Sequence, residues 1–364
     1  MTLRDLRHHI GQLLISGFDG LTVPVELRSL ARDFDLGGLI LFSRNVEAPE
    51  QVAEIALAAR EMQQELPLWV SVDQEGGRVQ RLKDEPFTRW PAMVTLGRAE
   101  DPALARRFAK ALALELAAVG INLDFAPVLD VLTNAKNPAI GDRAFSDNAE
   151  QVASLGAAII ETLQGQGMAA AGKHFPGHGD TGVDSHLDLP VCDLPPDRLR
   201  GVEFVPFRAA IKADVAFMLT CHVLFPALDE EWPATLSPTI VQGLLKEELG
   251  FRGAVLTDDL DMKAISARFP IEETVVRALR AGCDGLLICS GDYDTKARAL
   301  EALIREAESD KSFAKRVEDA STAMTRAKRR FLAAPRAPLN PDTVRAQLGP
   351  LDHQIVAEEM RRWL

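Results

Sequence analysis

The sequence lacks the features that mark membrane proteins and nucleic-acid-binding proteins. Residues 1–20 contain no apolar run long enough for a signal peptide or a membrane-spanning helix, because Asp5, Arg7 and two histidines interrupt them. Lysine and arginine number 41 against 53 aspartates and glutamates, so the net charge is −12. A nucleic-acid partner requires a basic face that neutralises its phosphates. We therefore expect neither a membrane nor a nucleic acid as a partner.

Cysteine is also scarce, and its spacing disfavours a common type of metal site. The chain has four cysteines, none of them in a C-x-x-C pair: Cys192, Cys221, Cys283 and Cys289. A zinc or redox centre built on paired cysteines is therefore not expected. Buried free thiols are typical of a reducing compartment, which predicts a cytoplasmic protein.

Eight short apolar runs are spaced along the chain. They cover residues 13–17, 38–42, 68–73, 121–127, 169–175, 215–222, 253–258 and 284–290. They are rich in Leu, Val and Ile without strict alternation, a pattern typical of strands buried on both faces of a parallel sheet. Helical patterns lie between them, most clearly at 49–66, 101–120 and 238–250, and the last two end at a glycine. This alternation predicts a closed (β/α)8 TIM barrel.

The alternative to a barrel is a doubly wound open sheet. It is disfavoured because no Gly-x-Gly-x-x-Gly follows the first strand. We predict that residues 1–310 form a catalytic barrel. Residues 311–364 contain amphipathic helical patterns at 314–334 and 353–364, which we expect to pack on the barrel as part of the same domain.

Polar side chains concentrate where the predicted strands end. In a (β/α)8 barrel the active site lies at the carboxyl ends of the strands, so this clustering indicates an enzyme. The residues concerned are Asp73, Asp124, Asp130, Lys173, His174, His222, Asp258 and Asp259.

The stretch "KHFPGHGDTGVDSH", residues 173–186, carries several titratable side chains on a glycine-rich loop. Asp184 and His186 lie two residues apart, so the aspartate could fix the tautomer of the imidazole while its other nitrogen moves a proton. Two other interpretations are open. The histidines could ligate zinc, or the loop could be solvated, with Asp184 or Ser185 capping a helix.

Two further motifs point to the same end of the barrel. In "LTDDLDM" the pair Asp258 and Asp259 follows a strand, and we expect one carboxylate to cap the backbone and the other to react. In "VDQEGGRVQR" Asp73 could accept hydrogen bonds from hydroxyl groups and Arg81 could bind a hydroxyl or carbonyl oxygen. No Gly-Lys-Ser/Thr follows the glycines, so a phosphate-binding loop is not expected.

Four motifs in order, "VDQEGGRVQR", "GDRAF", "KHFPGHGDTGVDSH" and "LTDDLDM", resemble glycoside hydrolase family 3 in its β-N-acetylglucosaminidase branch. The likeness is closest to the short, single-domain bacterial enzymes of cell-wall recycling. It implies Asp258 as nucleophile and His186, supported by Asp184, as acid/base. It also implies sugar binding by Asp73, Arg81, Arg143, Lys173 and His174. We expect no metal or cofactor, because the dyad interpretation gives His186 a carboxylate partner and not an ion. Ala144 stands where many relatives have serine, which leaves Arg143 in place.

The resemblance also implies an activity. We expect a monomeric, retaining exo-β-N-acetylglucosaminidase (a β-hexosaminidase) that removes terminal N-acetylglucosamine from muropeptides of the GlcNAc–anhydroMurNAc type. A histidine acid does not repel an anion, so an N-acetylglucosaminide phosphorylase is one alternative. A family 3 β-glucosidase is another, and a non-catalytic sugar-binding module is a third.

Overall fold

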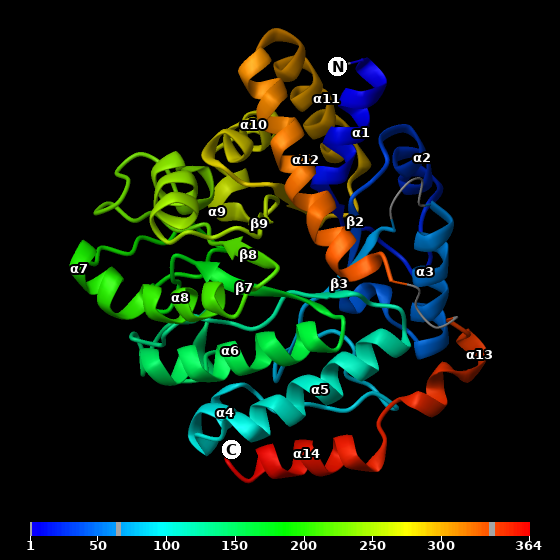
Figure 1. Ribbon diagram of the computed structural model, residues 1–364, viewed down its shortest axis with the longest axis vertical. Helices are drawn as coiled ribbons and strands as arrows, with labels where there is room; N and C mark the ends of the chain where they lie inside the picture. Colours follow the sequence, from blue (N-terminus) through cyan, green and yellow to red (C-terminus); the bar gives the residue numbers. More distant parts are fainter. Residues whose placement is uncertain (1, 63–66, 335–338) are drawn as a thin grey trace.

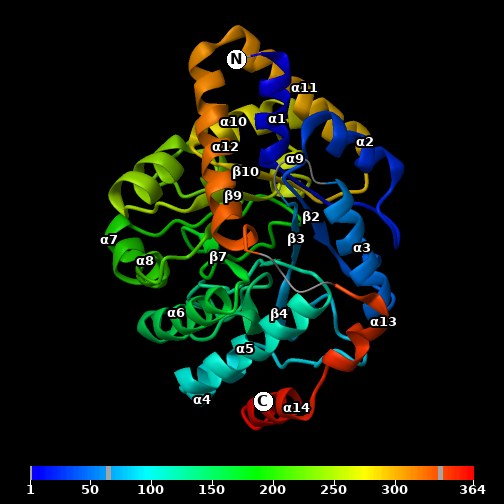
Figure 2. The ribbon, with the colours of Figure 1, turned by 45° about the vertical axis from the view of Figure 1, so that its right-hand side comes forward.

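Eight parallel strands form a closed barrel in the computed structural model, which describes residues 2–62, 67–334 and 339–364 (Figures 1 and 2). Around the barrel the order is β1-β10-β9-β8-β7-β6-β3-β2, and β1 pairs with both β2 and β10. The predicted (β/α)8 barrel is confirmed, and the open sheet is wrong because the ring closes. The strands are β1 Leu14–Ser16, β2 Gly38–Leu41, β3 Trp69–Val72, β6 Leu123–Asp124, β7 Ala169–Phe175, β8 Phe217–Thr220, β9 Ala254–Asp259 and β10 Gly285–Ile288.

Helices surround the barrel, as Figure 2 shows. The longer ones are α1 Leu3–Leu13, α2 Val25–Phe34, α3 Pro49–Met62, α5 Pro102–Ala118, α6 Ala149–Gly165, α8 Phe204–Lys212, α10 Ile271–Ala281, α11 Tyr293–Ser309, α12 Lys311–Leu332 and α14 Leu351–Arg361. Shorter α-helices are α4 Val94–Ala99, α7 Pro196–Arg198, α9 Lys263–Ser266 and α13 Pro341–Val344. Four 3-10 turns lie at Ser43–Asn45, Gly141–Arg143, Ala234–Leu236 and Arg345–Gln347. Two segments are π-helical: η3 Leu199–Glu203 and η5 Thr239–Glu248. A small hairpin, β4 Gln74–Gly76 and β5 Val79–Gln80, follows β3.

The predicted helices form, with local differences. The Asp101 side chain accepts a hydrogen bond from the Ala103 N–H and begins α5, and Gly120 follows its end with a φ of 83° that favours glycine. The helix predicted at 238–250 follows the wider π spacing, since the Leu249 N–H bonds to the Leu244 carbonyl five residues back. The pattern at 49–66 yields α3, and its residues 63–66 lie outside the described part of the chain.

The C-terminal segment contacts the barrel on two sides. Helix α12 packs along α1, and α14 packs on α5 (Figure 1). The buried Glu115 carboxylate of α5 accepts hydrogen bonds from the Thr88 N–H and hydroxyl at 2.9 and 2.5 Å and from the Gly349 N–H at 3.2 Å, and it pairs with His353 Nδ1 at 2.8 Å. Within the described ranges, no helix is both long and apolar enough to cross a membrane.

We expect Glu115→Gln to lower the free energy of unfolding by about 1–3 kcal/mol, because the amide nitrogen cannot accept and leaves buried donors unpaired. As the control, Glu359→Gln, which loses only the surface pair with Arg107, should change the free energy of unfolding by less than about 1 kcal/mol.

If residues 311–364 belong to the barrel domain, urea unfolding should be a single transition when followed by circular dichroism and by tryptophan fluorescence. Two separated transitions in the wild type would contradict the single-domain prediction.

Candidate active site

A cavity of about 240 Å³ opens at the carboxyl ends of the strands. Its wall includes all eight residues that the family resemblance implied: Asp73, Arg81, Arg143, Lys173, His174, Asp184, His186 and Asp258. Of the other strand-end residues, Asp259 also lines the wall, whereas Asp124, Asp130 and His222 lie outside it. The eight implied residues come from the ends of β3, β7 and β9, from the hairpin after β3 and from two long loops. The tertiary structure therefore brings together side chains that lie up to 185 positions apart in the chain (Asp73 to Asp258).

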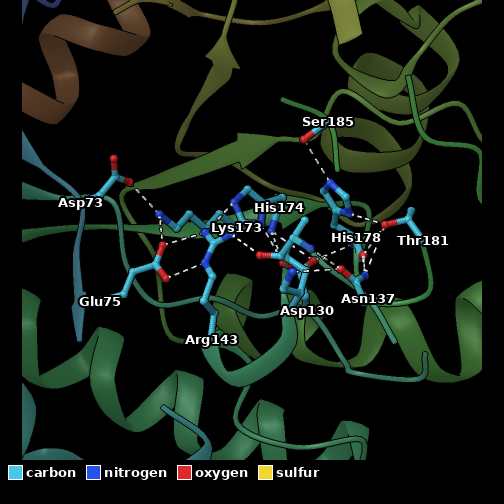
Figure 3. A network of polar contacts seen from close by, with 12 residues as sticks. Asp73, Glu75, Asp130, Asn137, Arg143, Lys173, His174, His178, Thr181 and Ser185 are labelled. Atoms are coloured by element: carbon cyan, nitrogen blue, oxygen red, sulfur yellow. Dashed lines mark hydrogen bonds and ion pairs between the residues drawn. The ribbon is translucent and has the colours of Figure 1, made fainter. Parts of the chain in front are cut away.

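The floor of the cavity is a network of buried and partly buried ion pairs, shown in Figure 3. Lys173 Nζ lies 2.8 Å from Asp73 Oδ1 and 2.6 Å from Glu75 Oε1. Arg143 binds both carboxylate oxygens of Glu75 at 2.8 Å, and Arg81 lies 3.2 Å from Asp73 Oδ2. Each of these charges has a partner, so the donors that face the cavity are held in fixed positions.

The electrostatics keep this network ionised. Burial by itself raises the pKa of Glu75, but Arg143 and Lys173 outweigh it and hold that pKa well below its usual value. Lys173 and Arg81 lower the pKa of Asp73 against burial in the same way. Burial tends to lower the pKa of Lys173, yet Asp73 and Glu75 raise it above its ordinary value. The floor therefore stays charged near neutral pH.

Asp130 links this floor to the long loop. Its Oδ2 lies 2.7 Å from His174 Nδ1, and its Oδ1 accepts the His178 N–H at 2.6 Å. Burial raises the pKa of Asp130, but His174 outweighs it, and the pKa is lowered. Because a carboxylate only accepts, Nδ1 of His174 carries the proton and Nε2 is the nitrogen directed towards Arg143, at 3.4 Å. One carboxylate thus orients both a sugar-binding candidate and the start of the loop.

The first part of the loop is fastened to the segment after β6. Asn137 Nδ2 donates to the His178 carbonyl at 2.7 Å, and His178 Nδ1 lies 2.7 Å from Thr181 Oγ1 (Figure 3). At Gly179 a Cβ atom would lie 1.8 Å from the Val131 carbonyl oxygen, so this close approach requires glycine. Residues 174–181 are therefore held in place by these contacts, and the residues that carry the predicted dyad follow them in the loop.

The predicted dyad lies in that later part of the loop. Asp184 Oδ1 accepts the His186 N–H and lies 2.9 Å from His186 Nδ1, which leaves Nε2 for proton exchange. The His186 side chain is 70% exposed and that of Asp184 27%. Burial raises the pKa of Asp184, but the two hydrogen bonds to His186 lower it on balance. The Ser185 carbonyl accepts the Ala264 N–H at 3.1 Å, which joins the loop to the segment after β9.

The two successive aspartates at the end of β9 have different environments. Asp259 Oδ1 accepts the N–H groups of Asp261 at 3.1 Å and Cys289 at 3.0 Å, and burial together with Asp261 raises its pKa to about 7. Burial raises the pKa of Asp258 too, but His222 and His174 lower it below its ordinary value. Both carboxylates line the cavity, and Asp258 is the ionised one of the pair, whereas Asp259 caps the backbone.

Three residues of the network were missed by the sequence analysis as site residues. Glu75 stands two positions after Asp73, and this period-two spacing was a usable signal that both side chains point the same way. Asp130 was noted only as a strand-end residue, and His178 only as part of the loop. Nothing in the sequence revealed that the Asp130 carboxylate accepts the His178 N–H.

Over the residues that the structure describes, no group of three or more His, Cys, Asp or Glu side chains is arranged to hold a metal ion.

The family model for the glycosyl hydrolase family 3 N terminal domain matches residues 5–327. The chain belongs to glycoside hydrolase family 3. It is 41% identical over 283 residues to a β-hexosaminidase from Alkalilimnicola ehrlichii, with 76% of this chain and 80% of that protein covered. It is 38% identical over 282 residues to β-hexosaminidase A from Pseudoalteromonas piscicida; this match covers 72% of this chain but spans only 47% of that longer protein.

Solved structures agree with this assignment. A family 3 β-N-acetylglucosaminidase from Paenibacillus sp. str. FPU-7 superposes with a TM-score of 0.91 at 38% identity, covering 100% of this chain and 69% of that one. NagZ from Neisseria gonorrhoeae, in complex with N-trifluoroacetyl-D-glucosamine, gives a TM-score of 0.77 at 29% identity, with 96% and 97% covered. The expected family is confirmed, and the chain is a glycoside hydrolase of the β-N-acetylhexosaminidase type.

The buried His178 makes the stability of the family 3 chain depend on pH. Burial lowers its pKa from 6.5 to about 4, so between these values the unfolded chain binds a proton that the folded chain does not. The stability from its neutral ring is complete above pH 6.5 and is lost as the pH falls towards 4. Urea unfolding at pH 4, 5, 6 and 7 should show His178→Gln with a shallower slope, by up to about 1.4 kcal/mol per pH unit. If the wild type and His178→Gln showed the same dependence of unfolding free energy on pH, His178 would not be the group responsible for this pH dependence.

Proposed function

We propose that the protein is a retaining exo-β-N-acetylglucosaminidase that acts on muropeptides of the GlcNAc–anhydroMurNAc type. The observation that carries this proposal is that an ionised carboxylate, Asp258, and a histidine–aspartate pair, His186 and Asp184, line the same small cavity above a floor of fixed donors. The names of the relatives support a hexosaminide as the substrate. The muropeptide aglycone rests on the resemblance to the cell-wall recycling enzymes.

The geometry supports a two-step mechanism. In the first step an Asp258 oxygen attacks the anomeric carbon, the glycosidic bond breaks, and His186 Nε2 delivers its proton to the departing oxygen. In the second step neutral His186 removes a proton from water, the water oxygen attacks the anomeric carbon, and the bond to Asp258 breaks. Asp184 accepts from Nδ1 throughout and stabilises the imidazolium form of the ring.

The cavity also favours a single sugar ring. Its volume of about 240 Å³ lies below the ~300–1,000 Å³ of pockets that hold drug-sized ligands, which suits one terminal residue. Lys173, Arg143 and Arg81 offer hydrogen-bond donors to the hydroxyls of an uncharged ring, and Nε2 of His174 offers an acceptor. A non-catalytic sugar-binding module would need the floor but neither Asp258 nor His186. We further propose that the enzyme is a monomer with a single domain. We also propose a cytoplasmic location, which the four buried cysteines without a disulfide support.

Turnover of p-nitrophenyl N-acetyl-β-glucosaminide should exceed that of the matching glucoside, because the proposed site accepts the 2-acetamido group. The rate should not depend on added phosphate, and N-acetylglucosamine should be released. Equal turnover of the two glycosides would favour the β-glucosidase alternative. Formation of N-acetylglucosamine 1-phosphate would favour the phosphorylase.

The two aspartates after β9 provide a matched pair of isosteric variants. Asp258→Asn should lower kcat by more than about 10³-fold while sugar binding stays measurable, because the amide cannot act as the nucleophile. Asp259→Asn keeps an oxygen that accepts the Asp261 and Cys289 N–H groups, so its kcat should stay near that of the wild type. Steady-state kinetics and isothermal titration with N-acetylglucosamine check both. An inactive Asp259→Asn beside an active Asp258→Asn would reverse the assignment.

The effect of His186→Ala should depend on the leaving group. A sugar alkoxide needs a proton, so glycosylation by a natural disaccharide should slow by about 10²-fold or more, whereas dinitrophenolate departs with little loss. Deglycosylation should then limit the rate, and azide should restore turnover and yield a β-glycosyl azide. Asp184→Ala should show a milder form of the same pattern. Equal losses on both substrates, without an azide product, would place His186 outside the chemistry.

A further inference from the structure

The mechanism above does not use His222, a histidine buried just beyond β8. Its side chain is fully buried and lies outside the wall of the cavity. Both ring nitrogens have partners: Nε2 lies 2.9 Å from the Asp259 carbonyl oxygen and Nδ1 lies 2.8 Å from Thr235 Oγ1. A buried imidazole bonded at both ends has one orientation, so the ring can transmit position from one strand to the next.

The direction of these hydrogen bonds follows from the chemistry of the partners. A carbonyl oxygen only accepts, so Nε2 of His222 carries a proton and donates it to Asp259. The Thr235 hydroxyl can donate to Nδ1, or accept from it while donating to the Cys221 carbonyl at 3.0 Å. Thr220 Oγ1, at 2.8 Å from Thr235 Oγ1, extends the same buried chain. The bond from Nε2 to Asp259 is therefore satisfied whether the imidazole is neutral or charged.

Asp259 is held from both sides of β9, which lies between β8 and β10 in the barrel. His222, after β8, holds its carbonyl, and the Cys289 N–H, after β10, donates to its carboxylate. The N–H of Asp259 donates to Asp258 Oδ1 at 2.8 Å. The residue that directs the carboxylate of Asp258 is thus tethered to both neighbouring strands.

We propose that His222 is a positioning residue for the nucleophile: by donating Nε2–H to the Asp259 carbonyl, it fixes the residue whose N–H orients the Asp258 carboxylate. This inference rests on the role proposed for Asp258. A nucleophile must lie within about 3–3.5 Å of the anomeric carbon with its oxygen aligned, and a displacement of ~1 Å can cost about 10²-fold in rate. His222 acts on the formation of the glycosyl–enzyme and not on sugar binding.

Two amide variants separate this hydrogen bond from the remainder of the side chain. His222→Gln places an amide N–H near the position of Nε2 and should keep most of the rate. His222→Asn places its amide near Nδ1, so it keeps the contact with Thr235 and loses the one with Asp259. The measurement is the burst of dinitrophenolate from dinitrophenyl N-acetyl-β-glucosaminide, together with KM and the melting temperature of each variant. We expect His222→Asn to slow the burst about 10- to 100-fold with KM changed by less than about threefold.

Two other outcomes for the burst rates of the amide variants would overturn the proposal. Wild-type burst rates in both variants would show that the bond does not position Asp258. Equal losses in both variants would assign His222 a packing role only. If either variant fails to fold, Thr235→Val serves instead. Without its Nδ1 partner the His222 ring is no longer held at both ends and can turn away from the Asp259 carbonyl, so the burst should slow with KM unchanged. A wild-type burst would overturn the proposal that the fixed ring positions Asp258. If glycosylation limits turnover and the wild type shows no burst, kcat/KM for the same substrate reports this step instead. An active Asp258→Asn would overturn the proposed mechanism itself.

Discussion

Four interlocking charges at the mouth of the barrel, two buried and two partly buried, impose the constraint on which the site depends. Glu75 and Lys173 lose their hydration there, and Asp73 and Arg143 lose most of theirs, at a cost of several kcal/mol per buried ion unless it meets an opposite charge. They come from the end of β3, the hairpin after it, the loop after β6 and the end of β7. Mutual neutralisation therefore fixes the relative positions of these segments before any sugar arrives, and the donors facing the cavity need little reorganisation on binding.

Asp130 extends this order from the floor to the loop. The carboxylate holds His174 and the backbone of His178, and the His178 ring contacts Thr181 and, at 3.3 Å from its Nε2, the buried Ser185 hydroxyl between the two dyad residues. The side chain of His186, by contrast, is largely exposed and is held mainly by Asp184. Recognition of hydroxyl groups requires fixed donors, whereas an acid that serves first an aglycone and then water must reach both. The distribution of hydrogen bonds along the loop matches these two demands.

Much of the fold was predictable because burial in a parallel barrel leaves a strong local signal. The eight apolar runs correspond to the eight strands, and strand-end residues such as Lys173 and Asp258 do line the cavity. The π-helical form of η5 was not predicted, since apolar periodicity does not distinguish i→i+5 from i→i+4 bonding over one short helix. Glu75 and Asp130 were missed because their importance comes from partners 68 and 44 residues away, Arg143 and His174.

By itself, the sequence determined the alternation of strands and helices, the end of the barrel at which chemistry is concentrated and the residue types available there. These properties follow from side-chain polarity and local spacing, which each segment carries on its own. Only the tertiary structure decided which carboxylate after β9 is the ionised one at the cavity. Adjacent aspartates have nearly the same local sequence, and their difference arises from groups on other strands. The Cys289 N–H, just after β10, binds Asp259, while His222, just after β8, and His174, on β7, lower the pKa of Asp258. The barrel places β8 and β10 on either side of β9, so the distinction exists only in the folded protein.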